Sequence, residues 1–135
     1  KAIKINPDFA DAHYNLGVIF KDLDNLLEAE LSYRKAIKIN PNFADAHYNL
    51  GIILRDLGKL QEAELSYRKA IEINPDFADA HYNLGVILQE LGKLQELILL
   101  SKSTLESTSI NQEYKLLSSL RLTIANLLQK DYFHQ

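Results

Sequence analysis

Hydrophobic positions follow a helical rhythm along the chain. Ala12, Leu16, Ile19 and Leu23 lie three or four residues apart, which places them on one face of a helix. A second stretch, roughly residues 26–39, repeats this spacing. Neither stretch is longer than about 15 residues, and a helix that short cannot bury its apolar stripe alone. We therefore expect pairs of short helices that share a core with neighbouring pairs.

The same pattern returns every 34 residues. Residues 10–43 and 44–77 agree at 26 of 34 positions, and a third copy follows closely from Ala78 through Glu96. Because proline lacks an amide hydrogen and has a fixed φ, we expect the first helix of each unit to begin after a proline. An Asn-Pro pair precedes each copy, at Asn6-Pro7, Asn40-Pro41 and Asn74-Pro75.

Glycine recurs at two places in the unit. Gly17 and its equivalents Gly51 and Gly85 fall in the middle of the first helix, where glycine costs about 1 kcal/mol relative to alanine. Because this loss of helix stability recurs at the same position of each unit, we expect the two helices to approach closely there. Tyr33 and Tyr67 are expected to fill the space between them. A second glycine, at Gly58 and Gly92, marks the turn between the two helices, where the first copy carries Asp24.

These patterns predict an all-α fold, an α-solenoid of antiparallel helix pairs with a degenerate helical cap at the C-terminal end. Residues 1–5 repeat residues 35–39, so we expect them to be the tail of a preceding repeat and the chain to be a piece of a longer protein. The predicted organisation is a truncated tail at 1–6, three repeats at 7–43, 44–77 and 78–111, and a capping helix with its tail at 112–135.

The repeated motif resembles that of the tetratricopeptide repeat family, with similarity to bacterial arrays of this repeat. The resemblance covers residues 1 to about 96. Two departures stand out: histidine replaces the family's usual tryptophan in the first helix, and in the third unit Leu97, Ser101 and Thr104 replace the Ala, Tyr and Ala of the second helix. The residues that carry the motif are Asn15-Leu16-Gly17, Ala29, Tyr33, Ala36 and Pro41, and again Asn49-Leu50-Gly51, Ala63, Tyr67, Ala70 and Pro75.

Composition narrows the functional classes. The 135 residues carry a net charge of -3, and a nucleic-acid binder usually has a basic surplus. The longest aliphatic run, residues 97–100, is far too short to cross a membrane, so we expect no membrane partner. Without cysteine there is no disulfide framework, and without a visible targeting signal we expect a cytoplasmic protein.

Catalysis is not expected. His13, His47 and His81 repeat with the unit, and equivalent side chains on stacked helix pairs lie about 10 Å apart, too far to share a zinc ion. The carboxylates recur with the same period, so they do not form a unique acid–base pair. We find no phosphate loop or nucleophile motif and therefore expect a non-enzymatic chain without metal or cofactor.

The resemblance implies a concave groove lined by the first helices, which binds extended peptides or helices of partner proteins. The ionisable side chains on this face, including Asp22, Asp56 and Glu90, are mostly acidic. We therefore expect a neutral to basic protein or peptide partner. The predicted contact residues are Asp11, Tyr14, Asn15, Val18, Lys21, Asp45, Tyr48, Asn49, Ile52, Arg55, Asp79, Tyr82, Asn83, Val86 and Gln89.

Two binding modes of the family require different side chains on this face. The carboxylate clamp of heat-shock co-chaperones needs basic side chains at places that Tyr14, Asp79 and Asn83 fill here, so we reject it. Asn15, Asn49 and Asn83 are similar to the asparagine ladder of O-linked N-acetylglucosamine transferase, whose amides can pair with any peptide backbone. The alternative is that each asparagine bonds to a neighbouring helix.

The C-terminal segment suggests a different role. A long helix is predicted from about Glu113 to Lys130, and its leucines spread too widely for one buried stripe. Such uncovered surfaces usually mark contacts. The alternative function is therefore assembly into a homo-oligomer, by end-to-end packing or swapping of repeats. The candidate residues are Leu116, Leu120, Leu127 and Phe133.

Overall fold

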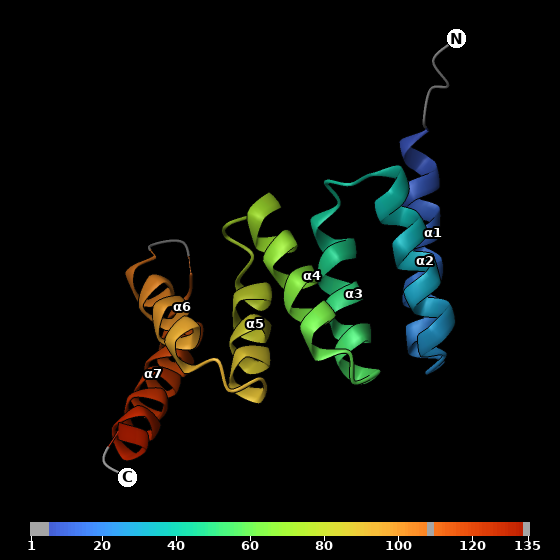
Figure 1. The fold of residues 1–135 in the computed structure, drawn as a ribbon. Coiled ribbons are helices and arrows are strands. Elements are labelled where there is room, and N and C mark those ends of the chain that lie inside the picture. Colours follow the sequence, from blue (N-terminus) through green and yellow to red (C-terminus); the bar gives the residue numbers. More distant parts are fainter. Residues whose placement is uncertain (1–5, 108–109, 134–135) are drawn as a thin grey trace. The chain divides into compact units, whose positions relative to one another are not determined.

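A computed structural model describes residues 6–107 and 110–133, except for the side chains of Pro7 and residues 131–133. This part of the chain contains helices and no strand, so the all-α prediction is confirmed (Figure 1). The expected repeat tail at 1–5 lies outside the described residues. The helices are α1 (Pro7–Asp22), α2 (Leu26–Ile39), α3 (Ala44–Asp56), α4 (Leu60–Ile73), α5 (Ala78–Glu90), α6 (Leu94–Glu106) and α7 (Gln112–Phe133).

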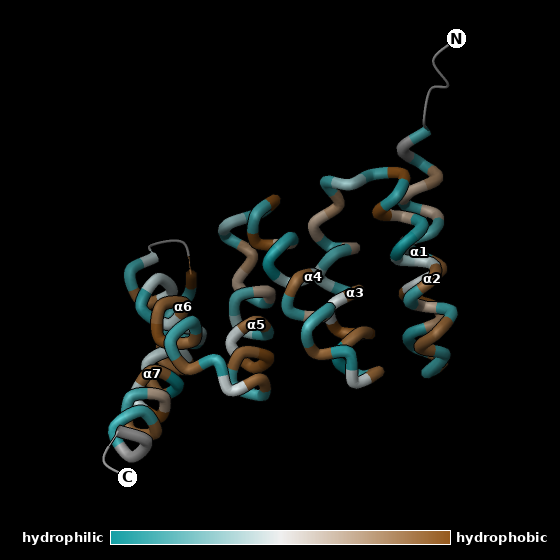
Figure 2. The backbone as a smooth tube through the Cα atoms, viewed as in Figure 1, coloured by the Kyte–Doolittle hydropathy of each residue, from teal (hydrophilic) through white to brown (hydrophobic). Residues whose placement is uncertain are grey.

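The helices fall into two compact units, residues 1–75 and 76–135. In the first unit, α1 packs antiparallel on α2, and α3 packs on α4 (Figure 1). Helix α2 also packs on α3 and so joins the two pairs. Hydrophobic positions recur along every helix, as a helix buried on one side requires (Figure 2).

The glycines in the middle of the first helices lie against tyrosine rings. A Cβ atom added at Gly17 would come within 2.6 Å of Cε1 of Tyr33, and one added at Gly51 within 2.6 Å of Cε1 of Tyr67. Both tyrosines are completely buried. The predicted close approach is therefore confirmed in both repeats of the first unit.

The turns within the three repeats need a left-handed backbone. Gly58 has φ 79° and Gly92 has φ 71°, a conformation that glycine adopts without steric cost. Asp24 occupies the equivalent place in the first repeat with φ 58°. Aspartate tolerates this conformation better than most side chains, which explains why the first repeat can form the same turn without glycine.

Helix starts differ among the repeats. Pro7 is the first residue of α1, and the side chain of Asn6 caps the helix by accepting a hydrogen bond from the amide of Asp8 at 3.0 Å. By contrast, α3 and α5 begin three residues after their prolines, at Ala44 and Ala78. The proline marks the entrance to each first helix, but not always its first residue.

The apolar face of α1 is more exposed than that of α3. Leu16 and Ile19 on α1 are 43% and 52% exposed. Their equivalents on α3, Leu50 and Ile53, are 4% and 0% exposed, because α2 packs on α3. Among the described residues, the same residue types are thus buried where a second helix packs on them, as α2 does on α3.

The second unit consists of α5, α6 and α7, and α7 packs chiefly on α6. In this unit Ser101 stands where the first two repeats have a buried tyrosine. The guanidinium of Arg121 on α7 lies instead beside Gly85. An arginine from α7 therefore occupies the space beside the glycine.

Candidate functional site

The predicted contact residues of the first unit lie along α1 and α3. We call this stripe the first-helix face. On α1, Asp11 and Asn15 are exposed, whereas Tyr14, Val18 and Lys21 are partly buried. On α3, Asp45 is exposed, and the rest are partly buried: Tyr48, Asn49, Ile52 and Arg55. The face therefore combines accessible carboxylates with half-covered aromatic and aliphatic side chains.

A contact between the two repeats engages Asn49. Its side-chain amide donates a hydrogen bond to the Tyr14 hydroxyl at 2.9 Å. The Tyr14 ring also stacks on Phe43, with 4.9 Å between ring centroids. Burial and the nearby carboxylate of Asp45 raise the pKa of Tyr14, while the hydrogen bond from Asn49 opposes that rise. The Asn49 amide thus bonds to a neighbouring helix, and only its remaining groups are available to a peptide.

Beneath this face lies the buried hydroxyl group of Tyr33. Its ring centroid lies 5.8 Å from that of Tyr14. Within the described part of the chain, its hydroxyl has no hydrogen-bond partner. Burial, together with Tyr14 and Asp22, raises the pKa of Tyr33 to about 12, so the hydroxyl keeps its proton at neutral pH.

In the second unit, α5 carries the predicted residues Asp79, Tyr82, Asn83, Val86 and Gln89. Asp79 and Gln89 are exposed, and the other three are partly buried.

Helix α7 already contacts two of these residues. The hydroxyl of Tyr114 donates to the carboxylate of Asp79. Arg121 lies over the Tyr82 ring, 4.6 Å from its centroid, and donates to the Tyr82 carbonyl oxygen at 3.0 Å. Burial lowers the pKa of Arg121, although Tyr82 opposes the effect. The α5 part of the predicted site is therefore partly occupied by the chain itself.

Sequence reasoning missed the roles of Tyr114 and Arg121. Both lie on α7, which does not carry the repeat motif, so no periodic equivalent points to them. The one available signal was the loss of the tyrosine at Ser101, which removes the expected neighbour of Gly85.

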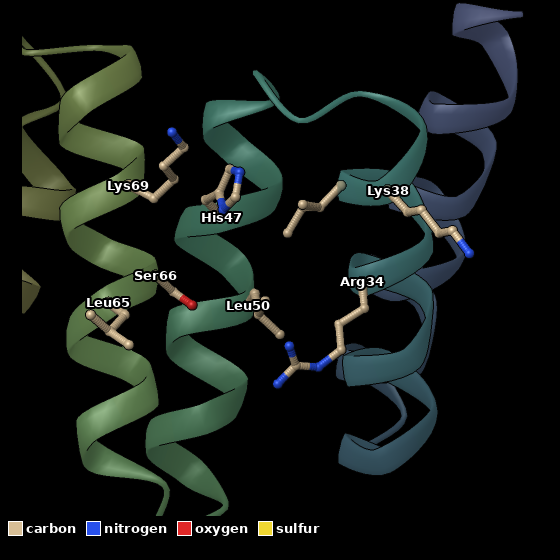
Figure 3. A pocket seen from close by; sticks show the side chains of 8 residues that line it. Arg34, Lys38, His47, Leu50, Leu65, Ser66 and Lys69 are labelled. Carbon is tan, nitrogen blue, oxygen red and sulfur yellow. The ribbon is translucent and has the colours of Figure 1, made fainter. Parts of the chain in front are cut away.

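A second surface feature of the first unit is a groove of about 390 Å³ between α2 and α4, with α3 as its floor. Figure 3 shows the Arg34 guanidinium reaching from α2 toward Leu50 on α3. Basic and aliphatic side chains dominate the lining, which includes no carboxylate. The lining residues are Arg34, Ile37, Lys38, His47, Leu50, Leu65, Ser66 and Lys69.

Charged groups at one end of this groove form a network that connects the two repeats. Arg34 bonds to Glu30 at 2.9 Å and to Glu62 on α4 at 3.1 Å, and Lys59 bonds to Glu30 at 3.1 Å. Burial raises the pKa of Glu30, but hydrogen bonds from Arg34 and Lys59 outweigh it and hold the pKa below its usual value. The network compensates part of the groove's positive charge.

At the other end of the groove, His47 interacts with the loop before α3. Its Nε2 atom lies 2.9 Å from the carbonyl oxygen of Pro41, which fits an Nε2–H donor. Burial lowers the pKa of His47, and this effect outweighs the hydrogen bond to Pro41. A lowered pKa favours the neutral imidazole at neutral pH.

The described residues, 6–107 and 110–133, hold neither a metal site nor a membrane span. There, no group of three His, Cys, Asp or Glu side chains is arranged to hold a metal ion. Within the same part of the chain, none of the helices combines the length and the hydropathy needed to span a membrane.

Comparison with protein families identifies the repeat. A model described as "TPR repeat" matches residues 51–92, and two described as "Tetratricopeptide repeat" match residues 32–64 and 10–43. None of the three models describes an enzyme. A comparison with curated proteins found no match.

Solved structures agree with the fold. The TPR domain of Arabidopsis OM64 is 20% identical, with a TM-score of 0.74 over 87% of this chain and 96% of that one. The first TPR of Spaghetti (RPAP3), bound to the HSP90 peptide SRMEEVD, is 20% identical, with a TM-score of 0.75 over 93% and 98%.

A further solved structure, that of MamA protein, is 31% identical, with a TM-score of 0.69 over 75% of this chain. This chain spans only 55% of the MamA chain. Family models over residues 10–92, the 34-residue period and the paired helices agree with one another, and the chain belongs to the tetratricopeptide repeat family.

Proposed function

We propose that the chain is a protein-interaction scaffold whose first-helix face binds an extended peptide of neutral to basic charge. Tetratricopeptide repeat domains are protein–protein interaction modules, and the proposal concerns where and what this one binds. The scaffold comprises the repeats at 7–43, 44–77 and 78–111, with residues 112–135 as a helical cap.

The observation that carries the proposal is the make-up of the first-helix face. Asp11 and Asp45 are exposed, and each is followed three residues later by a half-buried tyrosine, Tyr14 or Tyr48. Carboxylates attract basic side chains, and tyrosine rings offer rigid contact area at little entropic cost. The face thus suits a segment with lysine or arginine between small or apolar residues.

The bound peptide of the Spaghetti structure gives a useful contrast. That peptide contains two glutamates and an aspartate. The first-helix face here is itself acidic, and like charges placed across an interface weaken binding and exclude wrong partners. We therefore expect this chain to discriminate against acidic peptides of that kind.

The test is a binding titration with two synthetic probes, an eight-residue peptide of alternating lysine and serine and its glutamate–serine counterpart. Fluorescence anisotropy should show binding of the basic peptide only. Changing both Asp11→Lys and Asp45→Lys should weaken that binding by about tenfold or more. The control combines Glu28→Lys on α2 with Glu106→Lys on α6, which are both exposed; it makes the same total charge change outside the face and should have a smaller effect.

Two results would contradict the proposal. One is equal binding of both probes. The other is an equal loss of affinity in the Glu28 and Glu106 control and the face variants, since that would reflect net charge alone.

Self-association is the second candidate function. Three of the predicted residues, Leu116, Leu120 and Leu127, are 71%, 59% and 56% exposed on α7. The side chain of the fourth, Phe133, lies outside the described residues. Large aliphatic side chains at this exposure favour a contact surface on α7.

A further inference from the structure

Helix α7 exposes a stripe of large aliphatic side chains. The stripe that it turns toward the rest of its unit is mixed and partly polar, with Tyr114, Ser118, Arg121, Ala125 and Gln129 all buried or partly buried. Six large aliphatic side chains lie along one exposed stripe of the helix, which Glu113 precedes and the exposed Ser119, Thr123 and Asn126 border: Leu116, Leu117, Leu120, Ile124, Leu127 and Leu128. A helix that served only as a cap would not need six exposed aliphatic side chains on one stripe.

The spacing of the exposed stripe indicates what covers it. Leu117, Leu120, Ile124 and Leu127 follow one another at intervals of three, four and three residues. This is the spacing of the a and d positions of a heptad repeat, which pack against another helix as knobs into holes. Leu116 and Leu128 flank this seam and widen it. The stripe therefore fits a second helix rather than an extended peptide.

The arrangement of the six residues is also symmetric along the helix. Positions 116 and 128, 117 and 127, and 120 and 124 are each equidistant from Leu122. A two-fold interface requires one surface that is complementary to itself. A different partner helix would impose no such symmetry on α7.

We propose that two copies of the chain associate through α7 as an antiparallel pair, with the two-fold axis passing near Leu122. Leu117 then faces Leu127 of the second copy, and Leu120 faces Ile124. Each copy contributes the same six aliphatic side chains. The interface uses the exposed stripe of α7 and leaves α1 and α3 unchanged, so it does not depend on the proposed peptide site.

The first test is light scattering of the chain over a hundredfold range of concentration. A reversible monomer–dimer equilibrium, ending at twice the 15.4 kDa chain mass, is expected. Leu120→Glu should weaken dimerisation by roughly a hundredfold or more, because it places a charge inside an apolar seam. Ser119→Glu is the matched control, since Ser119 is exposed on another side of the same helix and should leave the dimer intact.

Circular dichroism of both variants checks folding. Leu120 is 59% exposed in the single chain, so its substitution should leave the helical signal unchanged. A wild-type mass that stays at 15.4 kDa, or one that keeps growing beyond a dimer, would overturn the proposal. So would equal effects of Leu120→Glu and Ser119→Glu.

The second test establishes the direction of pairing. The chain has no native cysteine, so a single cysteine introduced into each copy can form a disulfide only at the contact that it probes. Leu117→Cys and Leu127→Cys should form a disulfide-linked dimer only when the two proteins are mixed. In the antiparallel pair, two copies of residue 117 lie about 15 Å apart along the axis, beyond disulfide reach.

Cross-linking of each variant with itself would indicate a parallel pair and overturn the antiparallel arrangement. The absence of any cross-link in the mixture would overturn it as well. Because the peptide titration monitors α1 and α3, a failure of either proposal is distinguishable from a failure of the other.

Discussion

Single side chains decide how closely the helices of a repeat approach. Gly51 and Gly17 leave room for a tyrosine ring that no larger residue would permit. At Gly85 the neighbour is instead the guanidinium of Arg121. The glycine is common to the three repeats, but what fills the space beside it is a rigid ring in two of them and the end of a flexible chain in the third.

Because the neighbours differ, alanine should have different effects on stability at Gly51 and at Gly85. Gly51→Ala should lower the free energy of unfolding by about 1–2 kcal/mol, since the cost of overpacking exceeds the gain in helix propensity. Gly85→Ala should cost less, because an arginine side chain can shift more easily than the buried Tyr67 ring. Urea denaturation of both variants measures the two values. A loss at Gly85 as large as that at Gly51 would contradict this explanation.

At the scale of elements, each helix pair depends on a tight turn with one left-handed residue. The turn has the same conformation in the three repeats, although Asp24 replaces glycine in the first. A Cβ atom added at Gly58 would meet no atom within 4 Å. The backbone conformation, and not a lack of space, therefore explains the glycine there.

The prediction at this scale compares two substitutions of Gly58. Gly58→Val should lower the free energy of unfolding by about 1 kcal/mol, because a β-branched side chain disfavours positive φ. Gly58→Asp should cost less, since the first repeat accommodates aspartate in the same turn. Thermal and urea denaturation give the comparison. Equal costs for valine and aspartate would show that φ is not the deciding factor.

At the scale of the whole molecule, titrating groups connect stability to pH. In the first unit, Glu30 joins α2 to Lys59, and Arg34 joins it to Glu62 on α4. The pKa of Glu30 lies below its usual 4.5 and that of His47 below its usual 6.5. Both groups therefore bind protons more readily in the unfolded chain than in the folded one. Stability should rise with pH across both windows.

The two contributions should be lost in different pH ranges. The part due to His47 is fully present above pH 6.5 and falls as the pH drops toward the lowered pKa of the folded state. The part due to Glu30 is present above pH 4.5 and is lost below it. Urea denaturation across pH 7.5 to 3.5 should show that His47→Gln flattens the upper range alone, and Glu30→Gln the lower range alone. A His47→Gln profile parallel to that of the wild type would contradict the assignment.

Much of the fold could be predicted because each pattern in the sequence occurs in more than one repeat. The period, the helix pairs, the tyrosines beside Gly17 and Gly51 and the left-handed turns each depend on local spacing that appears more than once. These features are governed by interactions within a helix or between adjacent helices.

The candidate site was less predictable, because hydrogen-bond partners depend on where distant residues meet. Asn49 could have paired with a ligand or with a helix, and its amide nitrogen donates one hydrogen bond to Tyr14 on the neighbouring helix. The groove between α2 and α4 was missed, because its lining comes from three helices with separate periodic patterns. The sequence around Asn49 and around Arg34 contains no pattern that would predict these contacts.

By itself, the sequence determined a 34-residue repeat of two short helices and an acidic stripe along the first of them, because periodicity and charge are local properties. Only the tertiary structure decided that Arg121 fills the place beside Gly85 and that α7 covers Tyr114 and Ala125 while it exposes a stripe of six aliphatic side chains. The physical reason is that α7 lacks the repeat motif. Which face of such a helix is buried depends on the surface of α6 that it packs against, and not on its own hydrophobic pattern.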